Sequence, residues 1–312
     1  MFFFRKSPEG DNLRGLSVSV DELIEQRKFL PYIKKKHNTF TSDQAGDIRS
    51  AFKGRGMEFD EVRTYGFGDD VRDIDWRVTA RKNEPYTKVF SEEKDREVYV
   101  VLDLSAYMLF GTKKELKSVA AAKLAALLGW QSMANKDRFG LVLYDGTETR
   151  IFKPQNNQKN LMAVLKAISK TSDDILKETN ENRVRARNDI TEPLRFLQYN
   201  IKSRAMVFVL SDFKKISAEG LKSLVTLTKR CRVYCVNIYD YIEEVPPESG
   251  EYMAEYNGEK LIFDSSPEAF KRTYYNYFLE KRQTMENFCR KFNCQYLNIR
   301  TDRPLYKQLK IL

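Results

Sequence analysis

The chain has 312 residues, which suffices for one large domain or two ordinary ones. Lys and Arg number 54 against 44 Asp and Glu, so the net charge is +10, which favours general attraction to acidic surfaces. A hydrophobic content of 42% supports a core and argues against wholesale disorder. No apolar run approaches the roughly 20 residues that cross a bilayer, and the start "MFFFRKSPEG" lacks signal-peptide features, so we expect no direct membrane span.

The elements expected toward the N-terminus are a helix and a β-rich segment. Residues 20–36 have helical apolar spacing, and Pro31 should break or kink that helix. Residues 37–96 are charged and Gly-rich, with short β-type runs.

Strands and helices alternate from residue 97 onward. The expected strands are 97–105, 138–145, 204–212, 231–240 and 295–299, with 148–155 as a possible partner of the second; the expected helices lie near 113–134, 157–170, 190–201, 217–230 and 267–291. Residues 171–188 are expected to form a polar linker, and residues 241–265 a hairpin. Near-continuous apolar strands between helices predict an α/β fold, with a parallel sheet covered on both faces. We therefore divide the chain into residues 1–96 and an α/β domain over 97–312.

Cysteine and histidine usage limits the chemistry. The four cysteines indicate a reducing, cytoplasmic compartment. Cys231 and Cys235 have even spacing on an expected strand, so they should pack on one face as small apolar residues, whereas zinc would need closer pairing and more ligands. The single His37 lies in a basic, polar stretch, and the chain has no G-x-S-x-G, P-loop or G-x-G-x-x-G motif. A Ser-His-Asp hydrolase and a nucleotide-binding enzyme are both disfavoured.

A charged segment between Lys53 and Lys82 contains seven acids and seven bases. Exposed ion pairs contribute only about 0–1 kcal/mol each, so a solvated surface is one interpretation. Phe59, Tyr65, Phe67 and Trp76 are interleaved with the charges, however, and aromatic side chains favour burial. We therefore expect a salt-bridged clasp that docks on the α/β domain, with a binding surface as the alternative.

This segment carries a long motif. Residues 54–65 are "GRGMEFDEVRTY", residues 68–81 are "GDDVRDIDWRVTAR", and the strand that follows ends in "DLSAYM" at 103–108. The pattern closely resembles the bacterial domain-of-unknown-function 58 family, whose members are related to von Willebrand factor A domains. The strong match covers about residues 53–145; beyond it, the order of elements and "VLSDF" at 209–213 agree. The resemblance implies a von Willebrand factor A-like, Rossmann-like sheet.

The resemblance also implies a metal-ion-dependent adhesion site at the carboxyl edge of the sheet. Asp103 and Ser105 match the first loop of that site, and Asp212 matches the acid of the third loop. In the family, hydroxyls and carboxylates complete an octahedral oxygen shell that suits Mg²⁺, and an open position accepts a partner's carboxylate.

The site is incomplete in this sequence. Tyr107 stands where the family has a second Ser, and a phenol is too long to place its oxygen there. In the second loop Asn188 aligns with the family's Thr, Thr191 is an alternative donor, and Asn188 or Asp189 could cap the following helix. Tyr107 and Asp189 are therefore candidate interaction residues, and Mg²⁺ would be held weakly.

A metal-free fold is the competing interpretation of this edge. Asp103 and Asp212 would then accept hydrogen bonds from the backbone or from serines, and their mutual repulsion would raise a pKa. A basic side chain such as Lys113 or Arg187 could take the place of the cation.

The function implied by the resemblance is that of a non-enzymatic interaction module. It would work as an adaptor with a MoxR-type AAA+ ATPase and client proteins in the assembly or maturation of complexes, and partners could recruit it to membrane complexes. One alternative is a metal-dependent hydrolase that uses Asp103, Asp212 and Asp189. The other is a nucleic-acid-binding protein, which we disfavour because the aromatic residues of 274–278 have core-like spacing.

Overall fold

The computed structural model describes residues 15–33, 57–66, 69–92, 96–180, 189–256 and 259–309. The chain forms two compact units, one made of Met1–Thr39 with Arg96–Leu312 and the other of Phe40–Asp95. The N-terminal helix belongs to the first of these units, together with the α/β sheet. The sequence-based division at residue 96 stays a prediction.

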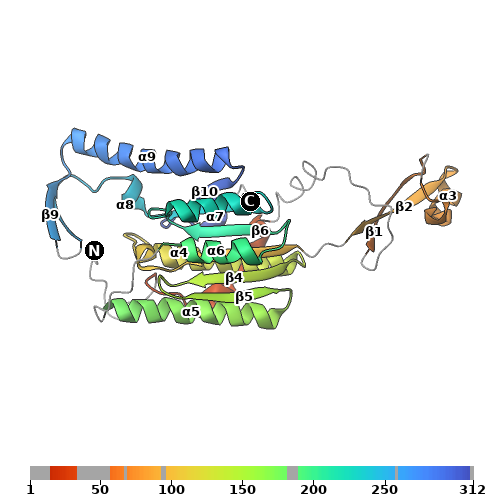
Figure 1. Cartoon of the computed structure of the whole chain (residues 1–312), viewed down its shortest axis with the longest axis horizontal. Helices are drawn as coiled ribbons and strands as arrows, with labels where there is room; N and C mark the ends of the chain where they lie inside the picture. The colour runs from red at the N-terminus through yellow and green to blue at the C-terminus, as the bar shows by residue number, and fades with distance from the viewer. Residues whose placement is uncertain are drawn as a thin grey trace. The chain divides into compact units, whose positions relative to one another are not determined.

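The larger unit is built on a six-stranded sheet with the order β10-β7-β6-β3-β4-β5 (Figure 1). Its strands are β3 (Glu97–Asp103), β4 (Arg138–Tyr144), β5 (Thr149–Gln155), β6 (Met206–Ser211), β7 (Arg232–Tyr239) and β10 (Gln295–Arg300). The first five strands in that order pair in parallel with their neighbours, and β5 pairs antiparallel with β4. The predicted, mostly parallel α/β sheet is confirmed, including the proposed partner of β4.

Helices cover both faces because the strand side chains alternate between two apolar cores. Val98, Val100 and Leu102 pack in one core with helices α4 and α5, while Tyr99 and Val101 pack in the other with α6, α7 and α9. The helices are α4 (Lys117–Ala134), α5 (Gln158–Asn180), α6 (Thr191–Asn200), α7 (Ala218–Thr228) and α9 (Glu268–Lys291). In Figure 1 the strands lie between α5 and α9. The arrangement is consistent with a von Willebrand factor A-like fold.

The N-terminal helix packs on the first of these cores. A capping box between Ser19 and Glu22 starts α1 (Val20–Glu25). The chain then tightens into a 3₁₀ turn over Gln26–Phe29 and continues as α2 (Leu30–Ile33), so the expected interruption lies just before Pro31. The indole N–H of Trp130 on α4 donates to the carbonyl of Leu23 at 3.1 Å, which ties this segment to the sheet unit.

Two predictions about the C-terminal half of the chain need correction. Residues 171–180 are not a polar linker, because α5 continues through them and buries Ile175 and Leu176. Tyr275 and Tyr277 do not pack in the core, because they are 45% and 63% exposed on α9.

The predicted hairpin is confirmed. It consists of β8 (Glu251–Tyr256) and β9 (Glu259–Asp264), after a short helix α8 (Tyr241–Glu244) that the sequence analysis did not predict. A last helical turn, α10 (Leu305–Gln308), follows β10.

The smaller unit is an antiparallel pair of β1 (Met57–Thr64) and β2 (Tyr86–Glu92), joined through a 3₁₀ turn (Val71–Asp73) and α3 (Trp76–Lys82). Residues of the long motif hold this connection together. Asp69 accepts hydrogen bonds from Arg63 at 2.6 Å and from the N–H of Gly66 at 2.8 Å, and Asp75 caps α3. The motif therefore has a local structural role.

The expected burial of aromatic residues in this unit is wrong for Trp76. Its side chain is 68% exposed on α3, although Asp75 beside it is well ordered by its capping bonds. Ion pairs of the expected kind are present, for example between Arg72 and Asp70 at 3.0 Å. Phe67 lies outside the described residues, and docking of this unit on the α/β unit stays a prediction.

Replacing Asp75 tests the role of the motif. In Asp75→Ala the N–H groups of Arg77 and Val78 lose their acceptor, so we expect a loss of about 1 kcal/mol in the free energy of unfolding of this unit. Amide hydrogen exchange in the full chain measures the effect at these positions. Asp75→Asn keeps an acceptor oxygen and should retain most of the protection. Equal exchange in both variants would contradict the capping role.

Candidate functional site

Acidic residues gather at the carboxyl edge of the sheet. Each of the five parallel strands ends in, or is followed within two residues by, an aspartate; these are Asp103, Asp145, Asp212, Asp240 and Asp302. The first four are buried, and Asp302 is half-buried. The carboxyl ends of strands are where open α/β sheets bind ligands. We call these five residues the acidic rim.

Asp103 at the end of β3 is satisfied by hydroxyl and backbone donors. The N–H of Ser105 donates to one carboxylate oxygen at 2.9 Å, and the hydroxyl of Ser211 donates to the other at 2.6 Å. Burial raises the pKa of Asp103, against the lowering effect of these hydrogen bonds, and the charge of Asp212 raises it further. The expected upward shift is confirmed in direction, with burial as its main cause.

Asp212 after β6 is paired with a buried lysine. The ammonium group of Lys117, whose side chain is 1% exposed, lies 2.6 Å from Asp212 and 3.2 Å from Glu243. Burial acts to lower the pKa of Lys117, but the two carboxylates outweigh it and raise that pKa. For Glu243 burial acts upward, and the charges of Lys117 and Lys214 bring its pKa below the usual value. A fixed cation thus sits between two acids at the rim.

The cation expected here was Lys113 or Arg187. Lys113 instead lies over the ring of Tyr241, with 3.3 Å from its nitrogen to the ring centroid, and Arg187 is outside the described residues. Lys117 takes this position because it stands one turn further along, at the first residue of α4. The sequence held a signal for it: the buried residues Lys117, Ala121 and Leu124 share one helical face.

Asp240 after β7 is fully buried. Its carboxylate accepts hydrogen bonds from the hydroxyl of Thr301 at 2.7 Å, from the N–H and hydroxyl of Thr112, and from the N–H of Ile242. Its N–H in turn donates to Glu243 at 2.9 Å. Asp240 therefore links the loop after β3 to the loop after β10 and fixes the helix that carries Glu243.

The two outer acids of the rim are also bound locally. Asp145 accepts from the hydroxyl and N–H of Thr147 and from the N–H of Glu148. Asp302 forms a bidentate pair with Arg300, whose guanidinium also contacts Glu244 at 2.8 Å.

The second-loop residues form a separate cluster at the start of α7. Asp189 accepts from the hydroxyl of Thr191 at 2.8 Å and from the N–H of Ser217 at 2.6 Å, and the hydroxyls of Thr191 and Ser217 lie 2.6 Å apart. Burial acts to raise the pKa of Asp189, but these hydrogen bonds lower it overall. Ser217 caps α7, so the cluster joins two helices. Asn188 lies outside the described residues.

A layer of lysines over aromatic rings lies along the loops of the rim. Lys215 is 5.1 Å from the ring centroid of Tyr107, and Lys214 is 6.0 Å from that of Phe110. With Lys113 over Tyr241, three such pairs are present; Lys113, Lys214 and Lys215 are exposed and the rings half-buried. We call these six residues the lysine–aromatic layer. Tyr107, the departure from the family's Ser, belongs to it.

The donor set does not fit a Mg²⁺ shell. Both oxygens of Asp103 are engaged by Ser105 and Ser211, and the carboxylate of Asp212 is paired with the ammonium of Lys117. Tyr107 supplies no short hydroxyl. Mg²⁺ demands near-ideal octahedral oxygen geometry, and a lysine ammonium beside these acids opposes a second cation.

The sequence comparison places the chain in a family. The family model described as "Protein of unknown function DUF58" matches residues 61–284. The chain belongs to this family. The motif that predicted it lies within the matched range from residue 61 onward, and Asp103, Lys117, Asp212 and Glu243 also fall within that range.

Relatives of this DUF58 chain include uncharacterized proteins of Mycobacterium bovis and Mycobacterium tuberculosis. They are 24% identical over 210 residues, which covers 67% of the chain and 63% of each relative. The matched region thus spans less than two thirds of the relatives' length.

Two solved structures are similar at low identity. The conserved hypothetical protein BatB from Bacteroides thetaiotaomicron is 13% identical, with 69% of this chain and 95% of that one covered and a TM-score of 0.39. An aerotolerance-related membrane protein from Bacteroides fragilis is also 13% identical, with 70% and 100% covered and a TM-score of 0.41. We base the fold on the strand order and not on these scores. Within the described residues of our DUF58 chain, no helix has the length and apolarity to cross a bilayer.

Removing the buried cation should destabilise the DUF58 fold. In Lys117→Met, Asp212 loses its buried cation and Glu243 keeps only the ion pair with Lys214, so we expect a loss of about 3–5 kcal/mol at pH 7. Urea unfolding measures the change. The triple variant Lys117→Met, Asp212→Asn, Glu243→Gln removes all three charges and should recover most of it. A triple variant no more stable than the single one would show that shape, not charge, sets the cost.

Asp103 and Asp189 should respond to pH in opposite directions. Because the pKa of Asp103 is raised on folding, its carboxylate reduces stability as pH rises through the folded value. Asp103→Asn should therefore gain stability relative to wild type as pH rises above the usual aspartate value. The pKa of Asp189 is lowered, so its contribution is present above the usual aspartate value and is lost as pH falls below it. Asp189→Asn should lose most at pH 7; the same sign of pH dependence in both variants would contradict these assignments.

Proposed function

We propose that this chain is a non-enzymatic protein-interaction module, an adaptor that works with a MoxR-type AAA+ ATPase in the assembly or maturation of protein complexes. The single observation that supports it most is the buried Lys117 between Asp212 and Glu243. It makes the edge of the sheet a fixed binding surface, with a protein cation where the related adhesion domains hold a metal ion.

The arrangement of the acids supports binding over catalysis. Asp103, Asp212 and Asp240 are each held by internal hydrogen bonds or an ion pair, and none of the three is exposed. A general base must reach a bound substrate or water, and these carboxylates are directed to protein donors.

The lysine–aromatic layer suggests the chemistry of the partner. Lys113 and Lys215 are exposed beside the half-buried rings of Tyr241 and Tyr107, and the chain carries a net charge of +10. Aromatic residues give binding energy, and charges of one sign steer an oppositely charged partner. We propose that the partner presents an acidic surface, so that its carboxylates meet lysines where an adhesion site would offer a metal.

We place the adaptor in the cytoplasm, where AAA+ ATPases have access to ATP. All four cysteines are free in the structure, which is consistent with a reducing compartment. Recruitment to membrane complexes would then be through partners.

Charge reversal on the layer tests the proposal. We expect Lys113→Glu with Lys215→Glu to slow association with a purified MoxR-type ATPase from the same bacterium at least about tenfold at low salt, and the wild-type rate to fall as salt rises. Biolayer interferometry over a salt series measures both.

The matched control is Lys166→Glu with Lys170→Glu, which makes the same charge change on two exposed lysines of α5. It should leave most of the rate intact. No binding of the wild-type chain by any MoxR-type ATPase of that bacterium would overturn the partnership. Equal losses in the two double variants would overturn the assigned surface.

A further inference from the structure

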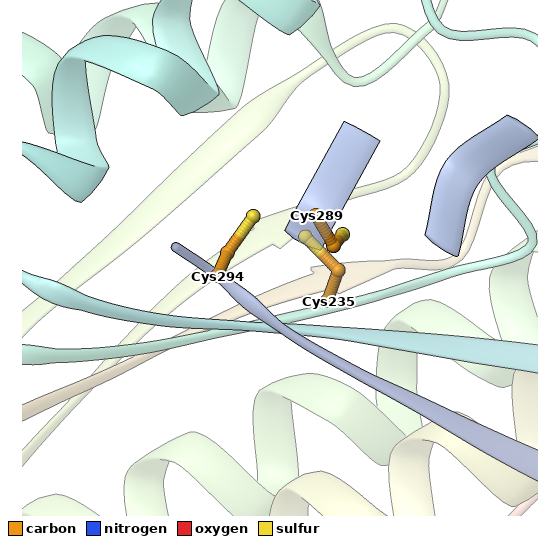
Figure 2. Close-up of side chains that lie close together, drawn as sticks. All are labelled: Cys235, Cys289 and Cys294. Atoms are coloured by element: carbon orange, nitrogen blue, oxygen red, sulfur yellow. The ribbon is translucent and has the colours of Figure 1, made fainter. Parts of the chain in front are cut away.

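Three of the four cysteines converge on one point in the second apolar core. Cys235 lies on β7, Cys289 near the end of α9 and Cys294 just before β10, and their sulfur atoms all lie within 4.8 Å of one another. Figure 2 shows the three side chains on the same side of the strands. We call these residues the thiol cluster. Their exposures are 0%, 1% and 8%, so the sulfurs face one another and not solvent.

Local structure holds the cluster in place. The N–H of Cys294 donates to the carbonyl of Cys289 at 2.9 Å, which closes the turn between α9 and β10. In the parallel register, Tyr296 lies beside Cys235 on the adjacent strand. The positions of the sulfurs are therefore set by the sheet and by one tight turn, and all three elements belong to the same unit.

The three sulfurs are neighbours of one another, so they can bind one ion together once they are deprotonated. A thiolate is the form of cysteine that binds metals. Packing alone does not require three small side chains to direct their sulfurs to one point.

We propose that Cys235, Cys289 and Cys294 bind one Cu(I) ion through three sulfur ligands. The ligand type selects a soft, thiophilic metal. The ligand number favours Cu(I) over Zn²⁺, since structural zinc is almost always four-coordinate and no carboxylate or histidine of the described residues joins the cluster.

Binding requires only a small movement. An ion at the centre of three sulfurs that lie within 4.8 Å of one another would be at most ~2.8 Å from each sulfur, and a metal–sulfur bond is about 2.3 Å, so each sulfur moves inward by no more than about half an ångström. Three S–H bonds lose their protons to solvent and three Cu–S bonds form. Copper enters as Cu(I) and stays in that state.

Anaerobic titration of the reduced full chain against a chromogenic Cu(I) chelator tests the proposal. We expect one equivalent of Cu(I) to bind. Alanine at Cys235, Cys289 or Cys294 should each weaken binding by more than the about 10–100-fold that loss of an outer-shell contact costs. The control is Cys231→Ala, because Cys231 is equally buried next to the same strand but lies outside the cluster and contacts the carbonyl of Lys202.

A second measurement avoids variants that fold poorly. X-ray absorption of the wild-type Cu(I) complex should show three sulfur scatterers, and Cu(I) should raise the thermal unfolding midpoint of the wild type. Binding that survives all three cluster substitutions, or no binding by the reduced wild type, would overturn the proposal. A Co²⁺ spectrum of tetrahedral form, with Zn²⁺ bound in preference to Cu(I), would overturn the three-ligand assignment.

Discussion

The buried ion pair of Lys117 with Asp212 and Glu243 is the constraint on which the edge of the sheet depends. It connects the start of α4, the loop after β6 and the short helix α8 through one ammonium group. Charges with exposures of 1–9% cannot be left unpaired, because each would cost several kcal/mol to desolvate. The three elements therefore hold one relative position, whether or not the cell supplies a metal ion.

The parallel topology explains why the carboxyl edge of the sheet needs a buried cation. When every strand runs in the same direction, the loops that follow the strands meet at one edge, and here each brings an aspartate. The chain satisfies them by different means: a serine hydroxyl and a backbone N–H for Asp103, a lysine for Asp212, threonine hydroxyls for Asp240 and an arginine for Asp302. Internal hydrogen bonds and ion pairs thus hold the acids of the rim. The lysines of the lysine–aromatic layer beside them are exposed, and its rings are half-buried.

Much of the fold could be predicted from the sequence, because apolar runs and the motif at the end of β3 depend on local interactions. The family resemblance singled out Asp103, Ser105 and Asp212, which lie at the carboxyl edge of the sheet; their role in a metal or binding site stays a prediction. The ion pair of Lys117 was not predicted. Helical spacing can indicate that a residue is buried, but it does not indicate which distant acid pairs with that residue. The end of α5 was missed because polar residues around Ser172 concealed the buried pair that begins at Ile175.

Trp76 shows a second limit of prediction from sequence. An aromatic residue inside a strong motif is expected to be buried, but the side chain of Trp76 is 68% exposed. The charged neighbours of Trp76 act within their own unit: Asp75 caps α3, and Asp69 accepts hydrogen bonds from Arg63 and Gly66 in the connection that follows β1. Residues that satisfy one another locally do not need a second surface, so their charges say little about docking. An exposed indole is different, because burial of its large apolar area on another protein is favourable. Trp76 in the smaller unit and the lysine–aromatic layer in the larger one are therefore the surfaces on which we expect a partner to bind.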